Sequence, residues 1–253
     1  MPQPTTSPLY DRIGTDYSIN RSTDPRLERQ LHDKLTGASR IINIGAGTGS
    51  YEPTRADLLA IEPSMEMIAQ RPESAHPVQQ ASAEALPVAD NSFSHAMTVL
   101  SMHHWRDRKM AFQEITRVAT ERFVAITWDP AAPPFWLTRD YFPEIFEEDL
   151  RIFPALDELE DNFDNVEVTP LLIPHDCIDG FLAAFWKRPA AYLDYRIRQS
   201  ISTFAKLENI DDGLERLKAD LDSGSWVARN ADLLSKQELD AGYRLITADI
   251  RND

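Results

Sequence analysis

The chain has 253 residues, of which 42% are hydrophobic and 26% are charged, and this composition excludes a wholly disordered protein. Its formal net charge of −15 argues against nucleic acid or an anionic membrane as a partner, because both are bound through clustered lysine and arginine. The single cysteine, Cys177, excludes an internal disulfide and a multi-cysteine metal site.

The first residues do not resemble a targeting signal. Residues 1–8 contain three prolines, but no basic segment followed by an apolar run. No stretch approaches the roughly 18 apolar residues that a membrane span requires. We therefore expect a soluble, cytoplasmic protein, and the sequence gives no indication of its oligomeric state.

Strand and helix patterns alternate along the chain. Residues 10–35 predict a helix, since Leu27, Leu31 and Leu35 recur at four-residue spacing. Shorter helices are predicted from Ser64, as the N-cap, to Arg71 and around residues 111–118. Apolar and β-branched runs predict strands at 41–44, 58–61, 78–81, 96–100, 123–128, 166–173 and 243–248. Such alternation is typical of a mostly parallel sheet with right-handed crossovers, and Pro170 predicts that the sixth strand is an edge or a bulged strand.

The composition changes after Pro130. Residues 178–236 predict a block of helices between two late strands, which indicates an insertion acting as a substrate lid. The aromatic residues of this block either form the lid core, as helical spacing favours, or line an apolar pocket: Phe181, Phe185, Trp186 and Tyr192. The predicted organisation is an amino-terminal cap over 1–35, a core over 36–177 and 237–253, and the lid over 178–236.

A glycine loop follows the first predicted strand. In Gly45-Ala46-Gly47-Thr48-Gly49, the glycines would let the backbone approach a cofactor closely. Glu62, 17 residues after Gly45, ends the second strand at the place where an acid can bind a ribose diol. Two cofactors suit this pattern: a nicotinamide dinucleotide in an NAD(P)-binding oxidoreductase, or S-adenosylmethionine.

The segment after the loop favours S-adenosylmethionine. Ser50 stands where the dinucleotide fingerprint has its third glycine. Only residues 50–57 separate the loop from the next strand, and Pro53 restricts any helix there. A pyrophosphate binds at the amino terminus of a full helix, whereas S-adenosylmethionine carries no phosphate.

Four segments, in this order, resemble class I S-adenosylmethionine-dependent methyltransferases. Residues 41–51 resemble motif I and residues 61–68 the acidic second motif. Residues 83–93 are similar to the adenine-side loop. Residues 101–105 are similar to the segment after strand four in the ubiquinone-biosynthesis-like and trans-aconitate-methyltransferase-like branches.

The resemblance implies an α/β fold: a Rossmann-like, seven-stranded, mostly parallel sheet with helices on both faces and a helical insertion between the last two strands. It also implies transfer of a methyl group to an O, N or C nucleophile of a small-molecule acceptor. Asn43 and Ser82 replace acids that are usual in the family. These two departures keep a non-catalytic, methyltransferase-like binding protein open as an alternative.

The resemblance also assigns roles to individual residues. The methionine part of the cofactor would be bound by Gly45, Ala46, Gly47 and Gly49, and its ribose by Glu62. The adenine would be bordered by Pro63, Met67, Ser82, Ala83 and Glu84, and the ammonium group would be bound by Val99 and Leu100. The amino-terminal segment would cover the cofactor with Tyr17 and Arg21.

His103 is the predicted general base. Imidazole titrates near neutrality, and in this fold the end of strand four faces the transferable methyl group. The alternative is a structural histidine that hydrogen-bonds the following helix. No metal site is predicted, because the adjacent residues of His175-Asp176-Cys177 cannot easily converge on one ion.

Overall fold

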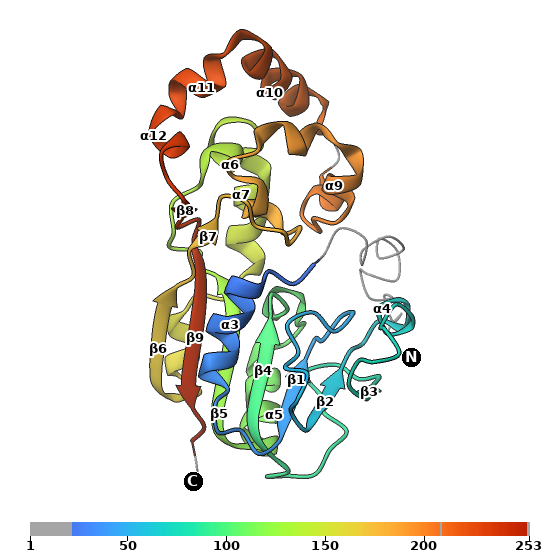
Figure 1. The fold of residues 1–253 in the computed structure, drawn as a ribbon. Helices are drawn as coiled ribbons and strands as arrows, with labels where there is room; N and C mark the ends of the chain where they lie inside the picture. The colour runs from blue at the N-terminus through green and yellow to red at the C-terminus, as the bar shows by residue number, and fades with distance from the viewer. Residues whose placement is uncertain (1–21, 208, 252–253) are drawn as a thin grey trace, which may run out of the picture.

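The computed structural model describes residues 22–207 and 209–251, so Tyr17 and Arg21 lie outside the described residues. Seven strands form one sheet in the order β3-β2-β1-β4-β5-β9-β6 (Figure 1). Their bounds are β1 Ile41–Ile44, β2 Leu58–Ile61, β3 Val78–Gln79, β4 Phe93–Val99, β5 Ala119–Trp128, β6 Asp164–Pro170 and β9 Tyr243–Asp249. Strands β1 to β5 are parallel, and β9 runs antiparallel between β5 and β6. The predicted Rossmann-like sheet with an antiparallel last strand is confirmed.

Helices cover both faces of the sheet. On one face, α3 (Pro25–Lys34) buries Leu27 and Leu31 in a cluster that includes Ile41. On the other face, α5 (Arg108–Val118) buries Phe112 in a cluster that includes Ile42. Because neighbouring residues of a strand point to opposite faces, the apolar run of β1 joins both clusters.

The helix starts follow from local capping. Asp24 accepts a hydrogen bond from the Arg26 amide at 3.0 Å, and Pro25 occupies the first turn of α3, where a missing N–H costs nothing. Ser64 caps α4 (Met65–Ala69), as predicted, by accepting from the Met67 amide at 3.2 Å. Asp107 caps α5 through the Met110 amide in the same way. The caps therefore fix where the chain enters each helix beside the strand ends.

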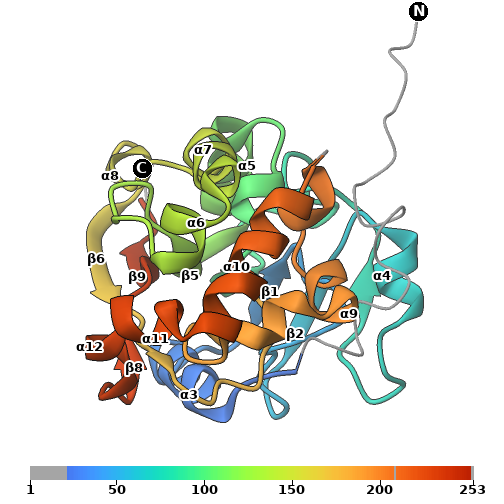
Figure 2. The same ribbon diagram turned by 90° about the horizontal axis from the view of Figure 1, so that it is seen from above.

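A second layer of helices lies beyond the carboxyl ends of the parallel strands (Figures 1 and 2). We call this layer the upper helices. It consists of α6 (Trp136–Asp140), α7 (Pro143–Ile152), η2 (Leu182–Phe185), η3 (Pro189–Leu193), α9 (Tyr195–Gln199), η4 (Phe204–Lys206), α10 (Asp211–Ser223), α11 (Ser225–Arg229) and α12 (Ala231–Leu234). Most of them lie between β7 (Ile173–Pro174) and β8 (Glu238–Leu239), which pair as a small antiparallel sheet.

The upper helices share one aromatic core. Trp136, Tyr192 and Trp226 are fully buried together, and the Trp136 and Trp226 rings meet edge to face with centroids 5.1 Å apart. Trp136 belongs to α6, which comes from the connection after β5, whereas Trp226 belongs to the 178–236 segment. The two connections therefore pack as one body, held by T-shaped aromatic contacts.

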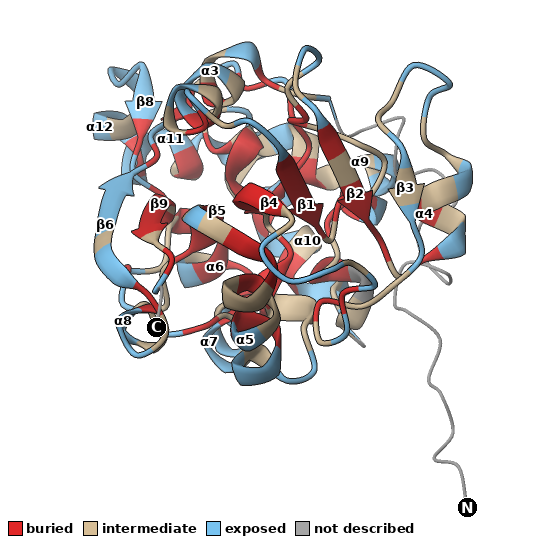
Figure 3. Cartoon of the chain, turned by 90° about the horizontal axis from the view of Figure 1, so that it is seen from below, coloured by how far each residue is buried: buried red, intermediate tan, exposed pale blue. Residues whose placement is uncertain are grey.

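Burial decreases towards one edge of the sheet. Strands β1 and β4 are almost entirely buried, whereas β6 is mostly exposed (Figure 3). The register of β6 against β9 shifts between Asp164 and Glu167, so the predicted edge position and irregularity of this strand are both confirmed. In the described part of the chain, no helix is both long and apolar enough to cross a bilayer.

Candidate functional site

The glycine loop leaves β1 in a backbone conformation that side chains disfavour. Gly45, Gly47 and Gly49 have φ values of 71°, 53° and 95°. A Cβ atom at Gly45 would overlap the Ser101 side chain, which follows β4. The amides of Gly45 and Ala46 both donate to the Ile61 carbonyl, at 2.9 and 3.0 Å. The loop is thus pinned to the end of β2, and the absence of a side chain at Gly45 leaves the space that Ser101 occupies.

Glu62, the residue directly after β2, holds the glycine loop in place. Its side chain is 5% exposed, and Oε2 accepts from the Gly47 amide at 2.8 Å while Oε1 accepts from the Ser64 amide at 2.9 Å. A Cβ atom at Gly47 would lie 3.3 Å from the Met67 side chain. The structure therefore brings together Gly47, Glu62 and Met67, three residues that the sequence predicted for one site.

A buried network beneath the loop was not predicted. The side chains of Glu52 and Arg71 are each 4% exposed and form an ion pair at 2.8 Å. Glu52 Oε1 also accepts from Asn43 Nδ2 at 3.0 Å, and Arg71 Nη1 donates to the Gly47 carbonyl at 3.2 Å. Glu52 thus places a carboxylate beside Asn43, and this carboxylate is engaged by Arg71. The sequence contained no signal for this network other than the unusual asparagine at position 43.

The proposed adenine side is built by backbone turns. Ala83 is buried in the cluster that contains Ile61, and the Ser82 carbonyl accepts from the Ala85 amide. Glu84 Oε1 accepts from the amides of Arg106 and Asp107, at 2.7 and 3.2 Å. Glu84 therefore holds the loop after β4. On the other side, Gln80 Nε2 donates to the Pro63 carbonyl at 3.1 Å, which ties the β3 end to the β2 end.

The chain turns sharply at the end of β4. Val99 ends the strand, and Leu100 has a φ of 49° and donates its amide to the Ile126 carbonyl at 2.8 Å. The turn leads into η1 (Met102–His104). There the His103 ring stacks on Phe153, with centroids 4.2 Å apart and an interplanar angle of 23°. Burial lowers the pKa of the neighbouring His104 to about 4, with a further contribution from Lys206.

His103 lines a cavity between the end of the sheet and the upper helices. The sheet side contributes Leu100, His103, Trp128 and Tyr243, and the upper helices contribute Phe146 and Asp149 among others. Burial raises the pKa of the Asp149 carboxyl to about 7, against the opposing effects of a Thr203 hydrogen bond and of Lys206. The sequence reasoning did not single out Asp149. Its spacing from Phe146, at i and i+3, is the signal that places these two on one face of α7, and Phe153 follows directly after the helix.

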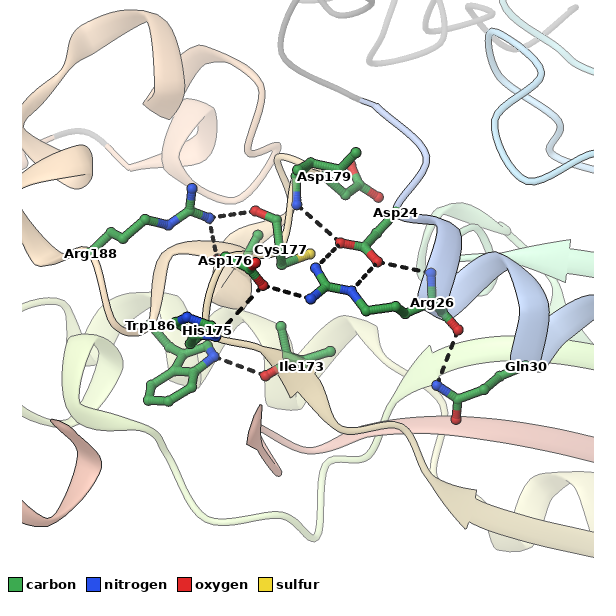
Figure 4. A network of polar contacts seen from close by, with 12 residues as sticks. Asp24, Arg26, Gln30, Ile173, His175, Asp176, Cys177, Asp179, Trp186 and Arg188 are labelled. Atoms are coloured by element: carbon green, nitrogen blue, oxygen red, sulfur yellow. Dashed lines mark hydrogen bonds and ion pairs between the residues drawn. The ribbon is translucent and has the colours of Figure 1, made fainter. Parts of the chain in front are cut away.

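A polar network joins α3 to residues 175–179, which precede the upper helices of the insertion (Figure 4). Arg26 pairs with Asp24 at 2.7 Å and with Asp176 at 2.6 Å, and Asp24 also accepts from the Ile178 amide. The Tyr51 hydroxyl, at the end of the glycine loop, donates to Asp179 at 2.8 Å. These contacts connect the segment before β1 to the start of the helical insertion.

The His175-Asp176-Cys177 segment takes part in this network, since Asp176 contacts both Arg26 and His175. Cys177 is fully buried, and burial raises the pKa of its thiol to about 12. Such a thiol stays protonated and behaves as a small apolar side chain. Over residues 22–207 and 209–251, no group of three or more His, Cys, Asp or Glu side chains is arranged to hold a metal ion.

Comparisons with known proteins agree with this geometry. Residues 42–122 match the methyltransferase domain family. The ubiquinone/menaquinone biosynthesis C-methyltransferase of Syntrophotalea carbinolica is 29% identical over 136 residues, which are 46% of this chain and 57% of that enzyme, so the match spans little more than half of the relative. Phosphoethanolamine N-methyltransferase 2 of Haemonchus contortus, solved with S-adenosylmethionine, shares the fold at 14% identity and a TM-score of 0.61, covering 100% of this chain and 62% of that one.

A further solved structure is similar to this chain at a higher sequence identity. It comes from Anabaena variabilis and is described as a methyltransferase from an antibiotic biosynthesis pathway. The two chains are 35% identical with a TM-score of 0.83, and the alignment covers 90% of this chain and 98% of that one. Similarity at this level, over almost the whole of both chains, shows that this protein belongs to the class I S-adenosylmethionine-dependent methyltransferases and uses S-adenosylmethionine as its cofactor.

Proposed function

We propose that the protein transfers a methyl group from S-adenosylmethionine to a small molecule bound in the cavity below the upper helices. The observation that carries this proposal is the position of the cavity, whose wall includes Leu100 and His103 at the end of β4. Ligands of open α/β sheets bind outside the carboxyl ends of the strands, where the glycine loop and Glu62 also lie. A walled cavity suits a small acceptor better than a polymer.

The residues around the glycine loop fit the cofactor. The positive φ angles from Gly45 to Gly49 expose backbone, and Glu62 is fixed at the position from which it would accept the ribose hydroxyls. Asn43 Oδ1 is buried, and no hydrogen-bond partner for it is found in the described part of the chain. We propose that this oxygen, with the carbonyls of Val99 and Leu100, receives the ammonium group. Pro63, Met67, Ser82, Ala83 and Glu84 would border the adenine.

His103 is proposed as the group that takes a proton from the acceptor. When bound, S-adenosylmethionine supplies a methyl group already activated by the sulfonium, so the protein has to align the acceptor, exclude water and remove a proton where one is present. Stacking on Phe153 fixes the orientation of the His103 ring at the cavity wall. The acceptor atom itself, O, N or C, decides whether this step is needed.

Two observations weigh against the alternatives. Residues 50–57 form turns and no helix, so a dinucleotide pyrophosphate would lack the helix amino terminus that binds it. The alternative of a non-catalytic binding protein rested on Asn43 and Ser82, and Glu52 now places a carboxylate 3.0 Å from Asn43. Cys177 is the single cysteine of the sequence and has no partner for an internal disulfide, which fits our proposal that the enzyme acts in the cytoplasm.

The proposal is tested in two steps. Calorimetry with S-adenosylhomocysteine and with NAD, in parallel, should give saturable binding of the former alone. A labelled-methyl transfer assay against a panel of small metabolites, with an oligonucleotide and a peptide included, should then give transfer to a small molecule only. Saturable binding of NAD alone, or robust transfer to the oligonucleotide, would contradict the proposed function.

A further inference from the structure

α7 and its C-cap residue line the cavity with two aromatic rings and a carboxyl group. Phe146, Asp149 and Phe153 all contribute to the cavity wall. Across from them, the Trp128 ring meets Phe146 and Phe153 edge to face, with centroids 5.8 and 5.5 Å apart. Trp128 Nε1 donates to the Ala241 carbonyl at 3.1 Å, which fixes the indole. The carboxyl group therefore lies within a rigid aromatic wall.

The carboxyl group of Asp149 is only partly satisfied by the protein. Asp149 is 6% exposed, and its Oδ1 accepts a hydrogen bond from the Thr203 hydroxyl at 3.2 Å. Lys206, whose charge acts on this carboxyl group, is paired with Glu148 at 3.3 Å, and Glu148 is also paired with Arg151. Within residues 22–207 and 209–251, Asp149 itself forms no ion pair. A carboxylate that is buried beside one hydroxyl costs folding free energy, which an apolar residue at this position would avoid.

The chemistry of this wall selects its ligand. Aromatic faces attract cations through their quadrupole, and a buried carboxylate forms a charge-assisted hydrogen bond with an ammonium group. An anionic ligand would be repelled, and a neutral hydroxyl would leave the carboxylate charge uncompensated. We propose that Asp149 binds the ammonium group of the methyl acceptor, so that the substrate class is an amine with an apolar body. This inference rests on the proposed function, because it takes the cavity to be the acceptor site.

The ionisation of Asp149 gives the proposal a pH signature. Because burial raises the pKa of this carboxyl to about 7, amine binding should strengthen as the pH rises through 7 and the carboxylate forms. The other titratable or charged groups around it are Glu148 on the same helix, Lys206 on η4, His103 and His104 on η1, and Tyr243 on β9. Because the imidazole of His103 also lines the cavity, only loss of the pH dependence in an Asp149 variant assigns it to Asp149.

The test uses arylalkylamines with one to four methylene groups, together with the alcohols and carboxylates of the same skeletons. Binding to the full chain, saturated with S-adenosylhomocysteine, is measured by calorimetry between pH 6 and 8.5. We expect an amine to bind about 10-fold or more tightly than its matched alcohol, and Asp149→Asn to remove this preference while alcohol binding stays unchanged. Glu147→Gln, which removes an exposed carboxylate from the same helix, is the matched control and should bind like the wild type.

Two further measurements distinguish loss of the amine site from loss of the fold. Thr203→Val retains the carboxylate but removes its hydrogen bond, so amine binding should persist with its pH midpoint shifted upward. Thermal unfolding of each variant shows whether it is folded. Amines that bind no more tightly than their matched alcohols, or that bind a folded Asp149→Asn protein as tightly as the wild type, overturn the proposal. Amine binding without methyl transfer to any acceptor would instead overturn the proposed function and leave the amine site standing.

Discussion

At the scale of single residues, Glu52 acts beneath the glycine loop as the counter-ion of Arg71, and Arg71 in turn holds the Gly47 carbonyl. Replacing Glu52 by glutamine leaves the Arg71 guanidinium buried without an opposite charge. Breaking a buried pair from one side typically costs about 3–5 kcal/mol. We therefore expect Glu52→Gln to lower the free energy of unfolding by an amount of this order and to weaken S-adenosylhomocysteine binding, measured by urea unfolding and calorimetry.

Glu73→Gln is the matched control for this prediction, because Glu73 is an exposed carboxylate close to Arg71 in the sequence. Exposed charge changes of this kind usually alter stability by less than about 0.5 kcal/mol. If Glu52→Gln were as stable as Glu73→Gln and bound S-adenosylhomocysteine equally well, the Glu52–Arg71 network would contribute neither to stability nor to cofactor binding.

His103 offers a second prediction at this scale. If it deprotonates the acceptor, the rate should rise with pH as the imidazole gives up its proton, around pH 6.5 for an unperturbed side chain. His103→Ala should then lower turnover by about 10² to 10⁴ and leave cofactor affinity nearly unchanged. His103→Gln serves as a bulkier comparison, since alanine also removes the ring that stacks on Phe153. A stable variant with full turnover would remove His103 from the reaction.

At the scale of elements, the start of α3 is tied to the helical insertion through Asp24. Burial alone would raise the pKa of this carboxyl group. Hydrogen bonds from the Arg26 side chain and from the backbone amides of Arg26 and Ile178 outweigh burial and lower the pKa to about 2. A carboxyl whose pKa is lowered by folding contributes stability above its unfolded pKa, near 4, and loses it as the pH falls towards 2.

Asp24→Asn keeps a good N-cap residue for α3 and removes the charge. We expect the variant to lose on the order of 1–2 kcal/mol of unfolding free energy at pH 7, and the difference from the wild type to shrink below pH 4. Urea unfolding at pH 7, 5 and 3 measures this, with the exposed Asp33→Asn as the control. A difference that stays constant across the three pH values would show that the charge of Asp24 is not responsible.

Strands were easier to predict from the sequence than the upper helices. The apolar runs of β1, β4 and β5 are stable only when they are buried, so they were recognisable as core strands. Pro170 limits β6 to an edge of the sheet. In contrast, α6 and α7 follow a proline-rich stretch in which aromatic and acidic residues alternate, and their packing against the 178–236 segment depends on contacts distant in sequence. Helix periodicity was present there, but burial of Trp136 could be recognised only in the folded chain.

The same limit applies to the site. Gly47 and Glu62 were predicted together because their spacing reflects a local strand-loop-strand unit, and the structure joins them by a hydrogen bond. Glu52 and Arg71 have no charged residue directly beside them in the sequence, and Asp149 ends the acidic run Glu147-Glu148-Asp149. A solvent-exposed position is the normal expectation for each. Their burial arises from the tertiary fold, and no spacing rule links them to their partners.

At the scale of the whole molecule, two of the perturbed carboxyl groups, Asp149 and Asp24, act in opposite directions on stability. Asp149 has a pKa raised to about 7, so the folded state binds a proton more readily than the unfolded chain between about pH 4 and 7. Its contribution to the free energy of unfolding therefore increases as the pH falls from 7 to 4. Protonation of other acids reduces the self-repulsion of a chain with a net charge of −15 and acts in the same direction. Below pH 4, Asp24 loses its stabilising charge.

We therefore expect the free energy of unfolding to be greatest on the acidic side of neutrality, between about pH 4 and 7. Urea unfolding of the wild type and of Asp149→Asn at half-unit steps from pH 3 to pH 8.5 tests this. Asparagine can still accept the Thr203 hydrogen bond but cannot ionise, so the variant should gain stability relative to the wild type at pH 8 and lose that advantage by pH 5. Because the net charge is nearly the same in both proteins, self-repulsion cancels in the comparison. Parallel curves for the two proteins would mean that Asp149 does not titrate differently in the folded state, and the pH dependence of the wild type would then belong to the remaining acids.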